Sequence, residues 1–110
     1  MSGALTTNQL VITGEIVQIV EFRYTPAGIP VLGFAIQHLS EQTEADMQRK
    51  VECELSVIAM GKLAEQIRNI RLGEQVQLTG FMTKRSLKST QLTLHLNTLE
   101  RIIKGLQHGT

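Results

Sequence analysis

Alternation of apolar and polar residues dominates the chain and is interrupted by a single helical pattern. Five segments alternate with period two, which predicts half-buried β-strands. These segments are residues 9–17, 32–37, 50–57, 76–81 and 92–97. Between the third and fourth segments, residues 61–70 place Leu63, Ile67 and Ile70 at positions i, i+4 and i+7, the apolar stripe of a short helix. The predicted order is therefore strand, strand, strand, helix, strand, strand.

This order of elements selects one fold class. Five strands with one short helix between the third and the fourth is the order of the OB-fold, an all-β Greek-key barrel. A β-sandwich needs about seven strands and no helix, and a parallel sheet needs alternating strands and helices. The polar stretches between strands, residues 40–48 and 83–90, are expected to be loops.

The length of the chain, 110 residues, leaves room for one hydrophobic core. We expect an OB-fold domain over residues 8–104, with a flexible N-terminus over residues 1–7 and a flexible C-terminus over residues 105–110. The sequence has no apolar run long enough for a transmembrane helix, and its N-terminus has no signal-peptide pattern. A cytoplasmic protein without membrane association is therefore expected.

Sequence motifs for catalysis and metal binding are missing. The sequence contains no phosphate-binding loop, dinucleotide-binding motif, zinc-protease motif or nucleophile elbow. Its three histidines are scattered, and the single cysteine, Cys53, shares a strand face with Val51 and Leu55. Cys53 is therefore expected to be a small buried residue rather than a reactive thiol. The sequence predicts no enzyme activity, no cofactor and no bound metal.

The formal net charge of +1 conceals two regions of opposite charge. Residues 75–104 contain five basic residues and one acidic residue, and no acid lies between Gln75 and Leu99. Residues 38–54 contain five acidic residues and two basic ones. A local basic surface attracts anions even when the whole chain is nearly neutral. The predicted loop over residues 83–90 is therefore a candidate contact for a phosphate backbone.

An OB-fold binds oligonucleotides on the face of its second and third strands, between the loops that follow the first and fourth strands. These positions give eight candidate DNA-binding residues, of which six are cations and two are aromatic. They are Arg23, Tyr24, Arg49, Lys50, Phe81, Lys84, Arg85 and Lys88. Phe81 could stack on a base or fill a subunit interface, and both alternatives stay open. Because the chain has no Trp and few other rings, its affinity for single strands is expected to be largely electrostatic.

Three segments resemble bacterial single-stranded DNA-binding proteins. They are NQLVITGEIV at residues 8–17, TPAGIPVLGFAIQH at residues 25–38 and VQLTGF at residues 76–81. The resemblance covers about residues 8–101 and is strongest to the small, single-OB members of the group, which act in the replication-restart primosome. It implies a non-enzymatic homodimer that binds single-stranded DNA. It also implies that the protein helps a restart helicase to hand a fork to helicase-loading proteins.

The resemblance also assigns roles to individual positions. It places Arg23 at a basic loop position used on DNA, and it equates the cations of residues 83–90 with the group's basic loop. Three positions depart from the pattern, because Met47 and Glu52 stand where better-known members have an aromatic residue and Leu39 stands where they have a basic one. An acid in place of a ring loses stacking and repels phosphate. We therefore expect weaker DNA binding than is usual for the group.

Two classes of function follow from these features. The first is a nucleic-acid-binding adaptor of the primosome, which the basic loop favours. The second is a protein-interaction module with little or no DNA binding, which the acidic residues 38–54 favour. An enzyme has no support beyond a fold that tolerates many functions.

Overall fold

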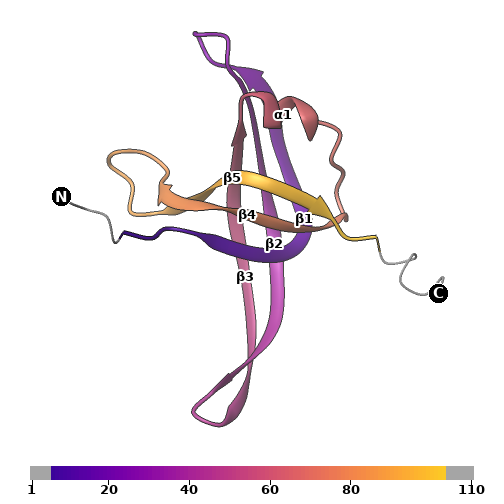
Figure 1. Ribbon diagram of the computed structural model, residues 1–110, viewed down its shortest axis with the longest axis vertical. Coiled ribbons are helices and arrows are strands. Elements are labelled where there is room, and N and C mark those ends of the chain that lie inside the picture. Colours follow the sequence, from indigo (N-terminus) through magenta and orange to yellow (C-terminus); the bar gives the residue numbers. More distant parts are fainter. Residues whose placement is uncertain (1–5, 104–110) are drawn as a thin grey trace.

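A computed structural model describes residues 6–103 and folds them into a closed barrel of five strands with one short helix (Figure 1). The elements are β1 Leu10–Tyr24, β2 Pro30–Glu44, β3 Met47–Met60, α1 Lys62–Gln66, β4 Gln75–Lys84 and β5 Leu92–Arg101. Around the barrel the order is β1, β2, β3, β5, β4, and only the pairing of β3 with β5 is parallel. The predicted fold class is confirmed. The predicted flexible ends, 1–7 and 105–110, lie outside the described residues apart from residues 6 and 7.

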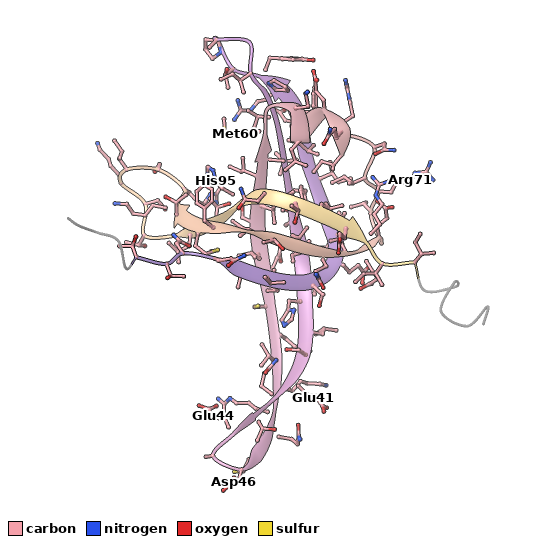
Figure 2. All side chains as sticks on the ribbon, viewed as in Figure 1. Glu41, Glu44, Asp46, Met60, Arg71 and His95 are labelled. Atoms are coloured by element: carbon pink, nitrogen blue, oxygen red, sulfur yellow. The ribbon has the colours of Figure 1, made fainter. Side chains whose placement is uncertain are left out.

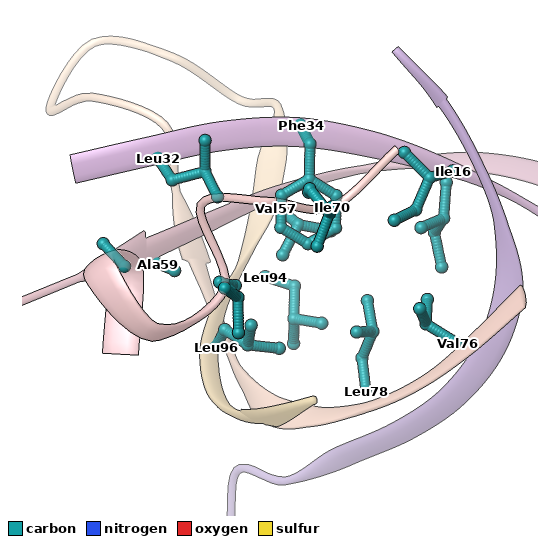
Figure 3. Close-up of a cluster of buried hydrophobic side chains, with 13 residues drawn as sticks. Ile16, Leu32, Phe34, Val57, Ala59, Ile70, Val76, Leu78, Leu94 and Leu96 are labelled. Atoms are coloured by element: carbon teal, nitrogen blue, oxygen red, sulfur yellow. The ribbon is translucent and has the colours of Figure 1, made fainter. Parts of the chain in front are cut away.

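The barrel interior is filled by apolar side chains from all five strands (Figure 3). Side chains that are at most 1% exposed include Ile16, Leu32, Phe34, Ile36, Val57, Val76, Leu78 and Leu94. Ala64, Ile67 and Ile70, from α1 and the turn after it, pack against this cluster. Phe34 points inward with Leu32 and Ile36, as the alternation of residues 32–37 indicates. Burial of one such large side chain stabilises the fold by about 1.5–3 kcal/mol.

The helix is shorter than predicted. A helix over residues 61–70 was expected, but α1 spans five residues, and the backbone leaves the helical region at Ile67, where φ is −110° and ψ is 16°. Turns continue the chain, because the Ile70 amide donates to the Ile67 carbonyl at 3.1 Å. Ile67 and Ile70 stay buried, so the apolar stripe was identified correctly and only its backbone conformation was wrong. No helix within residues 6–103 is long and apolar enough to cross a membrane.

The largest difference from the sequence-based prediction concerns residues 40–48, which were expected to be a loop. In the structure β2 and β3 remain paired as far as Glu44 and Met47, and only Ala45 and Asp46 form the turn. Both turn residues have positive φ, 53° and 64°, as in the two-residue turns whose twist suits a hairpin. We call residues 38–53 the ribbon, which projects beyond the barrel with Glu41, Glu44 and Asp46 near its tip (Figures 1 and 2).

The ribbon also explains why the expected burial of Cys53 is wrong. Cys53 pairs with His38 at the base of the ribbon and is exposed. The alternation of Cys53 with Val51 and Leu55 does continue the inward face of β3, but the ribbon leaves the barrel there and no core covers it. Because water reaches both faces of the ribbon, its residues 40–48 show no apolar alternation, and alternation indicated β3 only from residue 50 onward.

β1 is also longer than predicted, since alternation indicated a strand only over residues 9–17. Two register shifts, between Ile16 and Gln18 and between Ile19 and Glu21, interrupt its pairing with β2. A β-bulge inserts an extra residue, which breaks the period of two and bends the strand. The bent strand pairs first with β4 and then with β2, and so closes the barrel.

Candidate nucleic-acid interface

A groove of about 650 Å³ lies on the outer face of β2 and β3. Its floor contains the small side chains of Ala35 on β2 and Ser56 on β3, which face each other in the strand register. One wall comes from β1 and the other from residues 85–91, the β4–β5 loop. The residues that line the groove are Gln18, Val20, Phe34, Ala35, Glu54, Ser56, Arg85, Gln91 and Leu92. This is the face on which OB-folds bind oligonucleotides.

The β4–β5 loop is held in shape by its own hydrogen bonds. The Arg85 amide donates to the Gln91 carbonyl at 3.0 Å, and the Arg85 guanidinium donates to the Gln91 side-chain oxygen at 3.2 Å. The loop was predicted to begin at residue 83, but Lys84 is the last residue of β4, and its ammonium donates across to the Leu87 carbonyl at 3.1 Å. Within residues 6–103, no carboxylate forms an ion pair with Lys84, Arg85 or Lys88. The positive charge of the loop is therefore available to an anionic ligand, although only Arg85 lines the groove.

The two candidates near the end of β1 point to opposite faces. Arg23 lines a smaller hollow of about 170 Å³ that shares Val20 and Arg85 with the main groove. The Arg23 guanidinium lies 3.7 Å from the Glu21 carboxylate, and both side chains are largely exposed. Tyr24 alternates to the other side, where its ring meets that of Phe22 edge-on at 5.4 Å. Both residues belong to β1 rather than to the loop after it.

The two candidates at the start of β3 lie in the ribbon and do not line the groove. The Arg49 guanidinium forms an ion pair with the Glu44 carboxylate at 3.1 Å. Lys50 pairs in register with Glu41. Neighbouring carboxylates therefore offset both cations, in contrast to those of the β4–β5 loop.

Phe81 lies on the outer face of β4, beside β5. Its side chain is 39% exposed, and its ring centroid is 5.3 Å from that of His95. Phe81 does not line the groove, from which β5 separates it in the strand order. The expectation that Phe81 lies away from the core is confirmed.

Several groove residues were missed by the sequence analysis. Val20 is 62% exposed in the groove wall, and Gln18 lies next to it, both in the stretch of β1 where bulges hide the alternation. Glu54 shares its face of β3 with Ser56, and the alternation of residues 50–57 was the available signal for this placement. Phe34 is the one aromatic residue that lines the groove, and it is only 1% exposed.

Comparisons with known proteins agree with this geometry. Residues 8–98 match a protein-family model described as another single-strand binding protein family. The chain is 41% identical to replication restart protein PriB of Nitrosomonas europaea, over 86% of this chain and 87% of the relative. It is 35% identical to PriB of Proteus mirabilis, over 92% of this chain and 99% of the relative. The chain belongs to the single-strand binding protein family, as a member of its PriB group. The resemblance to primosomal proteins of this kind is confirmed.

Solved structures give the same result for the fold. PriB from Ralstonia solanacearum superposes with a TM-score of 0.78 at 27% identity, over 88% of this chain and all of that one. The wild-type single-stranded DNA-binding protein from Thermus aquaticus gives a TM-score of 0.72 at 18% identity, over 88% of this chain and 50% of that one, a likeness of fold alone. Members of the family are non-enzymatic DNA-binding proteins. Among the residues that the structure describes, no three His, Cys, Asp or Glu side chains gather to form a metal site.

Proposed function

We propose that the chain binds single-stranded DNA in the groove, with the phosphate backbone along the β4–β5 loop. The observation that carries the proposal is the position of this loop, which supplies Arg85 to the groove wall and whose neighbouring cations have no carboxylate partner within residues 6–103. Lys84, Arg85 and Lys88 would neutralise phosphates and release their counterions. Arg23 would continue this contact at the smaller hollow.

The affinity of this interface is expected to be moderate. The exposed apolar side chains of the groove, those of Val20 and Leu92, are aliphatic, whereas single-strand binders generally stack bases on aromatic rings. Glu54 adds a negative charge to the same groove, and Glu52 lies two residues away on the same face of β3. Loss of stacking and repulsion of phosphate both weaken binding, so the remaining affinity is electrostatic.

In the cell, we propose that the protein serves as an accessory protein of the replication-restart primosome, in the cytoplasm. There it would bridge the restart helicase to helicase-loading proteins while holding single-stranded DNA. The name of its relatives, replication restart protein, and the coverage of nearly their whole length support this assignment.

A protein-interaction module with little DNA binding is the second candidate function. The ribbon supports it, because Glu41, Glu44 and Asp46 gather near a tip that projects from the barrel (Figure 2). A projecting acidic hairpin suits a basic protein surface better than it suits DNA. The two functions are compatible, since the ribbon tip and the β4–β5 loop are separate segments.

Titration of a labelled single-stranded oligonucleotide at two salt concentrations tests the proposal. We expect binding at low salt, with an affinity that falls steeply as salt rises, because released counterions drive the association. Binding of duplex DNA of the same sequence serves as the comparison. An affinity that does not change with salt would contradict an electrostatic interface, and absence of binding at low salt would favour the protein-interaction module.

We also propose that the protein is a homodimer. Val11 on β1 is 56% exposed, and it faces Thr79 on β4, which shares its side of β4 with Phe81. Phe81 and His95 extend this surface across β4 and β5. Exposed apolar side chains on a continuous sheet face are typical of a two-fold interface, in which the same patch meets itself.

Light scattering at micromolar concentration is expected to give about twice the chain mass of 12.2 kDa. Phe81→Glu should shift the mass to that of the monomer, because it places a charge in the centre of the apolar contact. Leu72→Glu is the matched control, since Leu72 is 64% exposed elsewhere on the molecule. A wild-type mass of one chain would contradict the dimer.

A further inference from the structure

Glu54 stands out among the groove residues because its carboxylate has no partner. Glu54 is exposed on β3 and lines the groove next to Ser56, which belongs to the floor. Within residues 6–103 its side chain takes part in no ion pair and no hydrogen bond, whereas Arg85 is held by Gln91 and Arg23 by Glu21. A carboxylate only accepts hydrogen bonds, so its full acceptor capacity faces whatever occupies the groove.

The other side chains of the groove cannot distinguish one base from another by stacking on its face. Any discrimination between bases must therefore come from hydrogen bonds to their edges. No exposed ring is available for stacking, and the aliphatic side chains of Val20 and Leu92 contact any base equally. Gln18 and Gln91 carry amides that both donate and accept, so they tolerate every base. Among the residues that line the groove, only Glu54 has a side chain that accepts hydrogen bonds and cannot donate them. Its charge is also opposite to that of the cations proposed to hold the phosphates.

We infer that Glu54 is a specificity-determining residue that favours bases with an exocyclic amino group and disfavours thymine. Cytosine presents its N4 amino group, adenine its N6 amino group and guanine its N2 amino group, and each can donate to a carboxylate. Thymine has no exocyclic amino group, and its one ring donor, N3–H, lies between two carbonyl oxygens, which a carboxylate repels. The inference rests on the proposed function, because it concerns DNA bound in the same groove.

The acid therefore has a role beyond weakening the complex. Repulsion between Glu54 and phosphates acts on every sequence alike, whereas the contact with base edges differs between bases. Glu52 separates the two effects, since it carries the same charge on the same face of β3 and does not line the groove. Only Glu54 is positioned to read a base.

The test compares dissociation constants for oligo-dC and oligo-dT of equal length, at low salt and slightly alkaline pH, for the wild type, Glu54→Gln and Glu52→Gln. Glu54→Gln should bind both strands more tightly, and the ratio of its dissociation constants should move about three- to tenfold toward oligo-dT relative to wild type. The reason is that glutamine can donate to a thymine carbonyl. Glu52→Gln should also bind both strands more tightly, but its ratio should equal that of wild type.

The outcomes separate the inference from the proposed function. A ratio that is the same in all three proteins, or that changes equally in both variants, overturns the inference and leaves DNA binding intact. Failure of all three proteins to bind either strand at low salt overturns the proposed function, and the inference with it. Both positions are exposed, so circular dichroism spectra should show the same fold in all three proteins.

Discussion

Simultaneous replacement of Lys84, Arg85 and Lys88 by alanine is expected to weaken binding of single-stranded DNA and to flatten its salt dependence. Each phosphate contact contributes about 0.7 to the slope of log K against log salt for single strands, so three contacts contribute about two units. Between about 50 and 200 mM salt, the wild type should therefore lose up to roughly twentyfold more affinity than the variant. Fluorescence titrations at several salt concentrations measure both slopes.

A control variant is needed because removal of any positive charge weakens long-range attraction. Lys62→Ala combined with Arg71→Ala removes two exposed cations that do not line the groove. This control should lower the affinity slightly and should keep the wild-type slope. The fold of the triple variant should survive, because the β4–β5 loop is exposed and Leu87 at its tip is 92% exposed. A folded triple variant with wild-type affinity at low salt would place the DNA elsewhere on the protein.

How far the fold could be predicted depended on whether a strand has one face in the core. β4 and the first part of β5, residues 92–96, keep their alternation because their inward side chains, such as Leu78 and Leu94, fill the barrel. The ribbon has water on both faces, so its residues 40–48 carry no apolar period and looked like a loop. β1 has a core face, but its two bulges shift the period, and the strand was lost beyond residue 17. Apolar periodicity therefore reveals a strand only where one face is buried and the strand is regular. The ribbon lacks the first condition, and β1 lacks the second.

The candidate site was predictable to the extent that it depends on charge. A run of cations without acids is visible in any sequence, and Arg85 does line the groove. The direction of single side chains was harder to predict, because Arg23 and Tyr24 are neighbours that end on opposite faces of β1. Glu54 has no motif, and its importance comes from its position opposite the β4–β5 loop, which only the closed barrel creates.

Gly80 also has a role that becomes visible only in three dimensions. It is buried in β4 at a shift in the register with β5. Thr79 pairs with Thr98, whereas the next residue, Gly80, pairs with Leu96. A Cβ added at Gly80 would overlap the backbone carbonyl oxygen of His95 on β5. A backbone atom cannot rotate away as a side chain can, so the two strands would have to separate at the shift. Its alternation with Val76 and Leu78 is consistent with the inward face of β4, but no sequence pattern reveals the close approach of two backbones.

Gly80→Ala is therefore expected to lower the free energy of unfolding by about 3 kcal/mol, the upper part of the range for overpacked cores. Urea denaturation should show a lower midpoint with an unchanged slope. Gly33→Ala is the matched control, because its added Cβ would lie 3.6 Å from the Val20 Cβ, an ordinary van der Waals distance. This control should change the unfolding free energy by less than about 0.5 kcal/mol. Equal effects of the two substitutions would mean that alanine acts at Gly80 through general strand properties and not through contact between β4 and β5.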